Sequence, residues 1–104
     1  MSGFDDRKKA QEAKFAHDAQ LRFKAEARRN KLLALWVAEL IGHANPDAYV
    51  AEVIAADFEE AGDEDVFRKV SADIAAAGKG TTENEIREKM AELLALAQEQ
   101  VLSE

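Results

Sequence analysis

The chain has 104 residues and a formal net charge of −7, from 14 Lys and Arg against 21 Asp and Glu. A chain of this length forms one small core, which argues against two domains or a deep catalytic cleft. The overall acidity argues against general affinity for nucleic acid or anionic membranes. There is no Cys, so disulfides and thiolate chemistry are excluded and we expect a cytoplasmic protein. Since it has neither a basic-apolar leader nor 18 uninterrupted apolar residues, we expect no export or membrane insertion.

The hydrophobic spacing predicts an all-α fold with four helices. The first helix is expected to run from about Asp5 to about Ile41 without Pro or Gly and to stop at Gly42. The second opens at Asn45-Pro46 and ends near Glu60. The third starts at Asp63 and ends before Gly78, and the fourth opens at Thr82 with capping-box spacing. The expected core consists of Leu33, Trp36, Val37 and Leu40; Val50, Val53, Ile54 and Phe58; Val66, Phe67, Val70 and Ile74; and Ile86, Met90, Leu93, Leu94, Ala97 and Val101.

The first predicted helix is too long for its partners. At about 1.5 Å per residue it would span about 55 Å, whereas the others would span roughly 20, 20 and 30 Å. Its apolar face also fades upstream of Leu33, where Arg29, Arg22, Asp18 and Gln11 follow on the same side. We therefore predict a four-helix antiparallel bundle over residues 20–104, with residues 1–19 as an extended, flexible helical arm.

Charge is distributed unevenly along the chain. Residues 20–31 carry five basic side chains and only Glu26 as an acid, whereas residues 44–104 carry five basic and 15 acidic ones. We expect the basic segment to be held mainly by the acidic remainder of the fold. An alternative is a helical interaction or nucleic-acid-associated module that acts through residues 22–31.

Motifs for catalysis or metal binding are weak. Gly78-Lys79-Gly80 lacks the first Gly, the Ser or Thr and the preceding strand of a phosphate loop. The segment from Asp57 has Arg68 where a calcium loop requires a bidentate Glu, and His17 and His43 have no metal-ligand spacing. We predict no catalytic residues, no metal site and no enzymatic activity.

The chain contains several distinctive motifs, namely Phe4-Asp5-Asp6-Arg7, the run from Glu12 to Asp18, the run from Phe23 to Leu33, Asp57-Phe58-Glu59-Glu60 and Gly62-Asp63-Glu64-Asp65-Val66. Together these motifs resemble the zeta subunit of alphaproteobacterial F-type ATP synthase. The resemblance extends over nearly the whole chain. It implies a small inhibitor, built as a four-helix bundle with a mobile amino-terminal inhibitory segment.

The resemblance also implies a mechanism and a set of partners. The arm would enter a catalytic alpha/beta interface of the enzyme head, reach toward the gamma subunit and block rotation in the direction of ATP hydrolysis. The partner-binding residues would be Phe4, Asp5, Asp6, Arg7, Lys14, Phe15 and His17. We expect Phe4 and Phe15 to fill apolar sites and Arg7 and Lys14 to pair with acidic groups.

The resemblance further implies a location at the cytoplasmic face of the inner membrane when the protein is bound to the synthase. We expect a monomer when it is free, and no cofactor beyond the weak adenine-nucleotide binding described for similar bundles. The sequence departs from the family pattern at Lys8, Gln11 and Ala61. Gln11 interrupts the line from Phe4 to Phe15, which predicts weakened inhibition.

Overall fold

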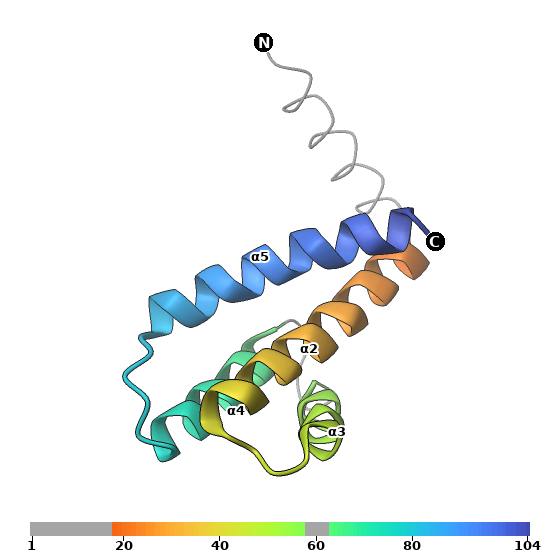
Figure 1. Ribbon diagram of the computed structural model, residues 1–104. Helices are drawn as coiled ribbons and strands as arrows, with labels where there is room; N and C mark the ends of the chain where they lie inside the picture. The colour runs from red at the N-terminus through yellow and green to blue at the C-terminus, as the bar shows by residue number, and fades with distance from the viewer. Residues whose placement is uncertain (1–17, 58–62) are drawn as a thin grey trace.

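The computed structural model describes residues 18–57 and 63–104. These residues form the helices α2 (Ala19–Ile41), α3 (Pro46–Ala56), α4 (Glu64–Ala76) and α5 (Glu83–Leu102), and no strand. The all-α prediction is confirmed. The long helices α2 and α5 run in opposite directions, and they lie closest where α2 begins and α5 ends (Figure 1). They diverge toward their other ends, where α3 and α4 pack against α2 (Figure 1).

Local sequence signals determine where the helices start. Asp18 caps α2, since its Oδ1 accepts hydrogen bonds from the backbone N–H groups of Gln20 (3.0 Å) and Leu21 (3.1 Å). Asn45 caps α3 and Thr82 caps α5 in the same way, as their spacing predicted. Asp63 precedes α4 but makes no side-chain cap bond. Its carboxylate instead faces arginines of α2 and α5.

Two glycines end helices as the sequence predicted. Gly42 has a φ of 69°, and the N–H of His43 then reaches back 2.8 Å to the carbonyl of Ala38. Gly78 has a φ of 72° after α4, and the N–H of Lys79 reaches the carbonyl of Ile74. A residue with a Cβ is strained at such positive φ values, so both turns favour Gly.

The predicted first helix needs a correction. Asp18 has an extended backbone (φ −117°, ψ 101°), so the helix does not run through it from Asp5, and α2 starts at Ala19. The backbone is extended here because the Asp18 carboxylate replaces the missing helical acceptors of Gln20 and Leu21. Residues 5–17 of the predicted helix lie outside the described residues.

The second helix also ends earlier in the chain than predicted. The helix α3 ends at Ala56, because the N–H of Asp57 bonds to the carbonyls of both Val53 and Ile54 and so tightens the last turn. Phe58 and Glu60, which the sequence assigned to this helix, lie outside the described residues.

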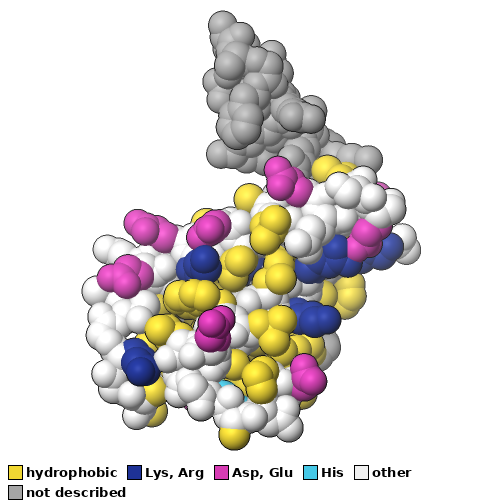
Figure 2. All heavy atoms as spheres, viewed as in Figure 1, with side chains coloured by type: hydrophobic (Ala, Val, Ile, Leu, Met, Phe, Trp, Pro, Cys, Tyr) yellow, Lys and Arg dark blue, Asp and Glu magenta, His cyan; other side chains and the backbone are white. Residues whose placement is uncertain are grey.

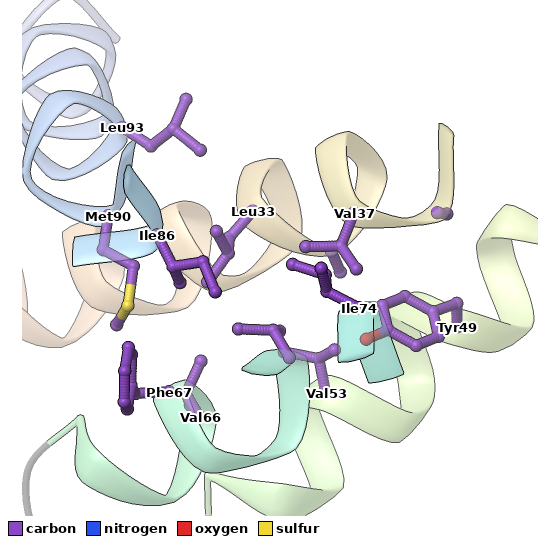
Figure 3. Packing of buried hydrophobic residues seen from close by; sticks show 13 residues of the cluster. Leu33, Val37, Tyr49, Val53, Val66, Phe67, Ile74, Ile86, Met90 and Leu93 are labelled. Atoms are coloured by element: carbon purple, nitrogen blue, oxygen red, sulfur yellow. The ribbon is translucent and has the colours of Figure 1, made fainter. Parts of the chain in front are cut away.

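The main core lies between the carboxyl-terminal half of α2 and the other three helices. Leu33, Val37, Val53, Val66 and Val70 are fully buried there, and most labelled side chains of this cluster point toward one another in Figure 3. The predicted core is largely confirmed, although Trp36, Leu40, Val50 and Leu94 are only partly buried. The prediction that Ile54 belongs to the core was wrong, since this side chain is 40% exposed, and Tyr49 takes the buried position on α3 instead. A smaller cluster of Ala25 and Val101, with Leu21 and Leu94 against it, joins the start of α2 to the end of α5.

Candidate partner-binding site

The amino-terminal half of α2 carries the basic segment predicted from the sequence. Arg28 pairs with Glu104 at the end of α5, and Arg29 Nη1 lies 3.5 Å from Asp63 Oδ2. Both contacts confirm that the acidic remainder of the fold holds part of this segment. Within the part of the chain that the structure describes, no ion pair reaches Arg22, Lys24 or Lys31, and all three are exposed. Three cations of the segment therefore face solvent.

Phe23 lies among these cations and is 66% exposed. It is separated by seven residues from Asn30 and by fourteen from Val37, which are 1% and 0% exposed. Residues seven apart lie on nearly the same side of a helix, about 20° apart. The side of α2 that is buried against α3 thus continues upstream to an uncovered Phe23, because α3 and α4 pack against the carboxyl-terminal half of α2 (Figure 1).

A buried polar cluster separates the two halves of α2. Arg29 Nε donates a hydrogen bond to Asn30 Oδ1 at 2.9 Å, and both residues are nearly inaccessible to solvent. Asp63 at the start of α4 pairs with Arg29, Asp57 at the end of α3 interacts with both residues, and the buried Asp65 lies close enough to affect Asp57. Burial raises the pKa of Asp57, the charge of Asp65 raises it further, and Arg29 and Asn30 lower it. The sequence placed Arg29 on the core side of the helix but did not show that acids would meet it there.

A second arginine extends this cluster to α5. Arg87 lies over the Phe67 ring, with its guanidinium carbon 3.6 Å from the ring centre, and its Nη2 lies 2.8 Å from Glu64 Oε1. Its Nη1 lies 3.9 Å from Asp63. The acids at the start of α4 are therefore bound by cations from both long helices.

A pocket of about 340 Å³ lies at the opposite end of the bundle, lined by Ile41, His43, Tyr49, Glu52, Lys69, Asp73, Ala76 and Ala77. The Tyr49 hydroxyl donates to Asp73 Oδ2 at 2.8 Å, and Lys69 Nζ lies 3.0 Å from the same oxygen. Lys69 also lies 3.7 Å from Glu52, and His43 Nε2 lies 3.8 Å from that carboxylate. The polar groups that line the pocket are thus paired with one another, and these pairs link α3 to α4. We call the linking residues Tyr49, Glu52, Lys69 and Asp73 the clamp.

Tyr49 and Lys69 have altered acidities in this clamp. Burial raises the pKa of the Tyr49 phenol far above its ordinary value, and its hydrogen bond to Asp73 acts in the same direction. For Lys69 burial lowers the pKa, but the hydrogen bonds and charges of Asp73 and Glu52 outweigh burial and raise it. Both groups therefore stay protonated at neutral pH and hold the clamp together.

The family model for "ATPase inhibitor subunit zeta" matches residues 1–100 of this chain. The chain belongs to the ATPase inhibitor subunit zeta family. A protein structure solved in solution by NMR is 50% identical, with a TM-score of 0.68, over 80% of this chain and 96% of that one. The curated proteins include no match. Membership in a zeta inhibitor family supports a regulatory role at an ATPase rather than a catalytic one.

The predicted partner-binding residues of this zeta-family chain all precede the described residues. They are Phe4, Asp5, Asp6, Arg7, Lys14, Phe15 and His17, and their roles stay predictions. The described residues begin directly after them, with Asp18 and the first turn of α2. From the sequence, Phe23 was assigned no role beyond its place in the run from Phe23 to Leu33. Its seven-residue spacing from Asn30 and Val37 is the signal that places it on the line of the core.

In residues 18–57 and 63–104, no group of three or more His, Cys, Asp and Glu side chains could hold a metal ion. None of the four described helices is long and apolar enough to cross a membrane.

Proposed function

We propose that this protein inhibits ATP hydrolysis by an F-type ATP synthase, and that residues 1–19 insert into a catalytic alpha/beta interface of the enzyme head. The inserted arm would reach toward the gamma subunit and block rotation in the hydrolytic direction. The match to the zeta inhibitor family over residues 1–100, which includes the arm, is the observation that carries this proposal.

The fold supports separate roles for the arm and the bundle in binding the head. The four described helices bury two hydrophobic clusters among themselves. Asp18 has an extended backbone and caps α2, so α2 itself begins at Ala19. A bundle with its own core would stay outside the head and limit how far the arm enters. The division into an arm of residues 1–19 and a bundle of residues 20–104 is part of this proposal.

The arm has few residues that could provide binding energy. Phe4 and Phe15 are its large aromatic side chains, and buried aromatic anchors dominate the affinity of many interfaces. Arg7 and Lys14 would pair with acidic groups of the head, while Asp5, Asp6 and His17 would add polar contacts. The ordering of such a segment on binding costs free energy, so inhibition should depend strongly on the two aromatic anchors.

Titration of the isolated enzyme head with the full-length protein tests the proposal. The wild type should reduce ATP hydrolysis, and Phe4→Ala and Phe15→Ala should each raise the half-inhibitory concentration by about tenfold or more, which corresponds to about 1.4 kcal/mol. Ile54→Ala on α3 is the control and should inhibit like the wild type. Hydrolysis that does not respond to the wild-type protein would refute the proposed function.

Gln11→Phe provides a gain-of-function test of the same arm. A third aromatic between Phe4 and Phe15 should lower the half-inhibitory concentration several-fold, because it restores a continuous apolar line. Gln11→Leu serves as the comparison for apolarity without a ring. Equal potency of wild type and Gln11→Phe would show that position 11 does not contact the head.

The remaining expectations belong to the same proposal. The protein would be monomeric when free and would associate with the alpha, beta and gamma subunits at the cytoplasmic face of the inner membrane when bound. Co-sedimentation with membrane vesicles that contain the synthase, compared with vesicles stripped of the head, tests this location. Weak adenine-nucleotide binding stays a prediction, which equilibrium dialysis of the full-length protein against labelled ATP would test.

A further inference from the structure

We infer that Phe23, Lys24 and Lys31, with Ala27 between them, form a second docking surface that binds an acidic protein surface with an apolar recess. The inference rests on the proposed function, since the partner it names is the head of the ATPase around the entrance that receives the arm. Arm and surface would then bind the same partner, the arm inside it and the surface at its rim.

The geometry of α2 places these residues together. Counted from Phe23, the next residues of the surface follow after one, four and eight positions, namely Lys24, Ala27 and Lys31. At these spacings the four side chains occupy about one quarter of the helix circumference. All four are exposed. Farther along the helix, the same side is covered, with Ala34 and Val37 at 0% exposure. The surface is thus the uncovered continuation of a core face.

Two features indicate that a partner covers this surface. An aromatic side chain with 66% exposure is unfavourable in water, and Phe23 is the most exposed large apolar residue in the described part of the chain. Around it, Lys24 and Lys31 have no acidic partner among the described residues, whereas neighbouring Arg28 and Arg29 each have one. The fold therefore pairs Arg28 and Arg29 internally and leaves Lys24 and Lys31, together with the exposed Arg22, for an external anion.

The charge distribution identifies the chemistry of the partner. The chain is acidic overall, with a net charge of −7, yet Lys and Arg side chains gather toward the end of the molecule where α2 begins (Figure 2). A local basic surface on an acidic protein attracts acidic surfaces while the rest of the molecule repels them, which orients the encounter. The aromatic at its centre requires an apolar recess, which a protein supplies more readily than a phosphate backbone does.

The position of the surface connects it to the arm. Phe23 lies four residues after Ala19, the first residue of α2, and thus about 6 Å along the helix axis. When the arm occupies its site, this part of the bundle is the first to meet the rim of the entrance. The surface would then act on affinity, and the arm alone would act on rotation.

Inhibition assays on full-length variants separate these roles. Phe23→Ala should raise the half-inhibitory concentration about fivefold, and the double variant Lys24→Glu/Lys31→Glu should raise it about tenfold or more at low salt. Both variants should still inhibit completely at saturation, because they leave the arm intact. The matched controls are Ile54→Ala, an exposed apolar residue on α3, and Lys79→Glu, an exposed lysine after α4, and both should stay within twofold of wild type.

The dependence on salt provides an independent readout. Raising the salt concentration from about 0.05 to about 0.3 M should weaken wild-type binding to the head and should affect the double lysine variant less, since screening acts on charges that the variant lacks. Unchanged potency in both Phe23→Ala and the double variant would overturn the inference and leave the proposed function intact. Failure of the wild type to bind the head would overturn both.

Two other ligands of the docking surface, nucleic acid and a second copy of the chain, would give results that differ from those of an acidic protein surface. Binding of the wild type to a labelled DNA duplex at low salt, lost in Lys24→Glu/Lys31→Glu, would assign the surface to nucleic acid and overturn the inference. Concentration-dependent dimerisation in sedimentation, lost in Phe23→Ala, would assign it to a second copy of the chain and overturn it as well. A monomeric wild type with no retention of the duplex supports the acidic protein partner.

Discussion

The two halves of α2 have similar lengths but differ in composition and environment. Its carboxyl-terminal half buries Leu33, Ala34 and Val37 against three other helices. Its amino-terminal half contacts α5 through Leu21 and Ala25 and exposes Phe23 and its neighbouring cations. One continuous helix therefore contributes to the main core with one half and exposes an aromatic ring and several cations with the other, where we propose the docking surface.

The boundary between the two halves is polar. Arg29 and Asn30 occupy buried positions where an apolar helix face would otherwise continue, and they face acids at the end of α3 and the start of α4. A buried charge destabilises a fold unless it is paired, so this cluster requires the acids in a specific place. We infer that it fixes how α3 and α4 meet α2. The halves should thus respond differently to mutation.

The largest contrast is expected between two leucines. Leu33→Ala should lower the free energy of unfolding by about 2 to 5 kcal/mol, because it leaves a cavity in the main core. Leu21→Ala should cost about 1 kcal/mol or less, because Leu21 is only partly buried in the small cluster. Urea unfolding monitored by circular dichroism measures both. Equal losses would show that the two halves contribute alike to stability.

The next largest effect is expected at the boundary. Arg29→Met keeps the approximate size of the side chain but removes its charge, and should cost about 2 kcal/mol at pH 7, since Asp57 and Asp63 then lose their interaction with a buried cation. Arg29→Lys keeps the charge without the planar donor group and should cost less. Urea unfolding at pH 7 ranks the three proteins. A fully stable Arg29→Met would contradict a role for the cluster in stability.

The same variant has a predictable pH dependence. Burial already raises the pKa of Asp57 above its ordinary 3.8, and loss of Arg29 should raise it further. A carboxyl with a raised pKa in the folded state lowers stability as pH rises through the interval between its unfolded and folded values. The loss in free energy of unfolding caused by Arg29→Met should therefore be greatest at neutral pH and should shrink as the pH falls toward about 4.

An effect of about 1 kcal/mol is expected at the opposite end of α2. Tyr49→Phe removes the hydrogen bond to Asp73 that links α3 to α4. In the wild type, burial raises the pKa of Tyr49 well above 10, so the unfolded state loses its proton first and stability falls as pH rises above 10. The variant lacks this group and should lose less stability over the same range, although the raised pKa of Lys69 weakens both proteins there.

Urea unfolding of wild type and Tyr49→Phe at pH 7, 9 and 11 measures how their free energies of unfolding approach each other. The gap between wild type and Tyr49→Phe should stay near its full size up to pH 9 and narrow at pH 11. Lys79→Ala, which changes an exposed lysine outside the clamp, is the control and should follow the wild type. A gap of constant size at all three pH values would mean that Tyr49 does not govern the alkaline limb.

Much of this fold could be predicted because its signals are local. Asn45-Pro46, Thr82, Gly42 and Gly78 define helix ends through bonds within a few residues, and the structure places all four as predicted. The break at Asp18 was missed since Asp is also common inside long charged helices, and only its cap geometry distinguishes the two cases. Local patterns thus located most of the helix ends but missed that α2 begins only at Ala19.

Tertiary features were harder to predict. The burial of Arg29 and Tyr49 depends on acids more than twenty residues away in the sequence, and no periodicity indicates such pairs. The exposure of Ile54 and Phe23 likewise depends on where neighbouring helices end. The partner of the arm was identified by family resemblance alone, and the arm residues Phe4 to His17 lie outside the described residues.

The smallest effect is expected at the residue next to the boundary. Arg28 pairs with Glu104 at the end of α5, but the two side chains are 33% and 49% exposed. Water and salt screen such a pair, so Arg28→Gln should change the free energy of unfolding by no more than about 0.5 kcal/mol, and by less in about 0.5 M salt. Urea unfolding at both salt concentrations measures this. If Arg28→Gln cost as much as Arg29→Met, charge pairing rather than the contact of Leu21 and Ala25 with Val101 would hold the amino-terminal half of α2 to α5.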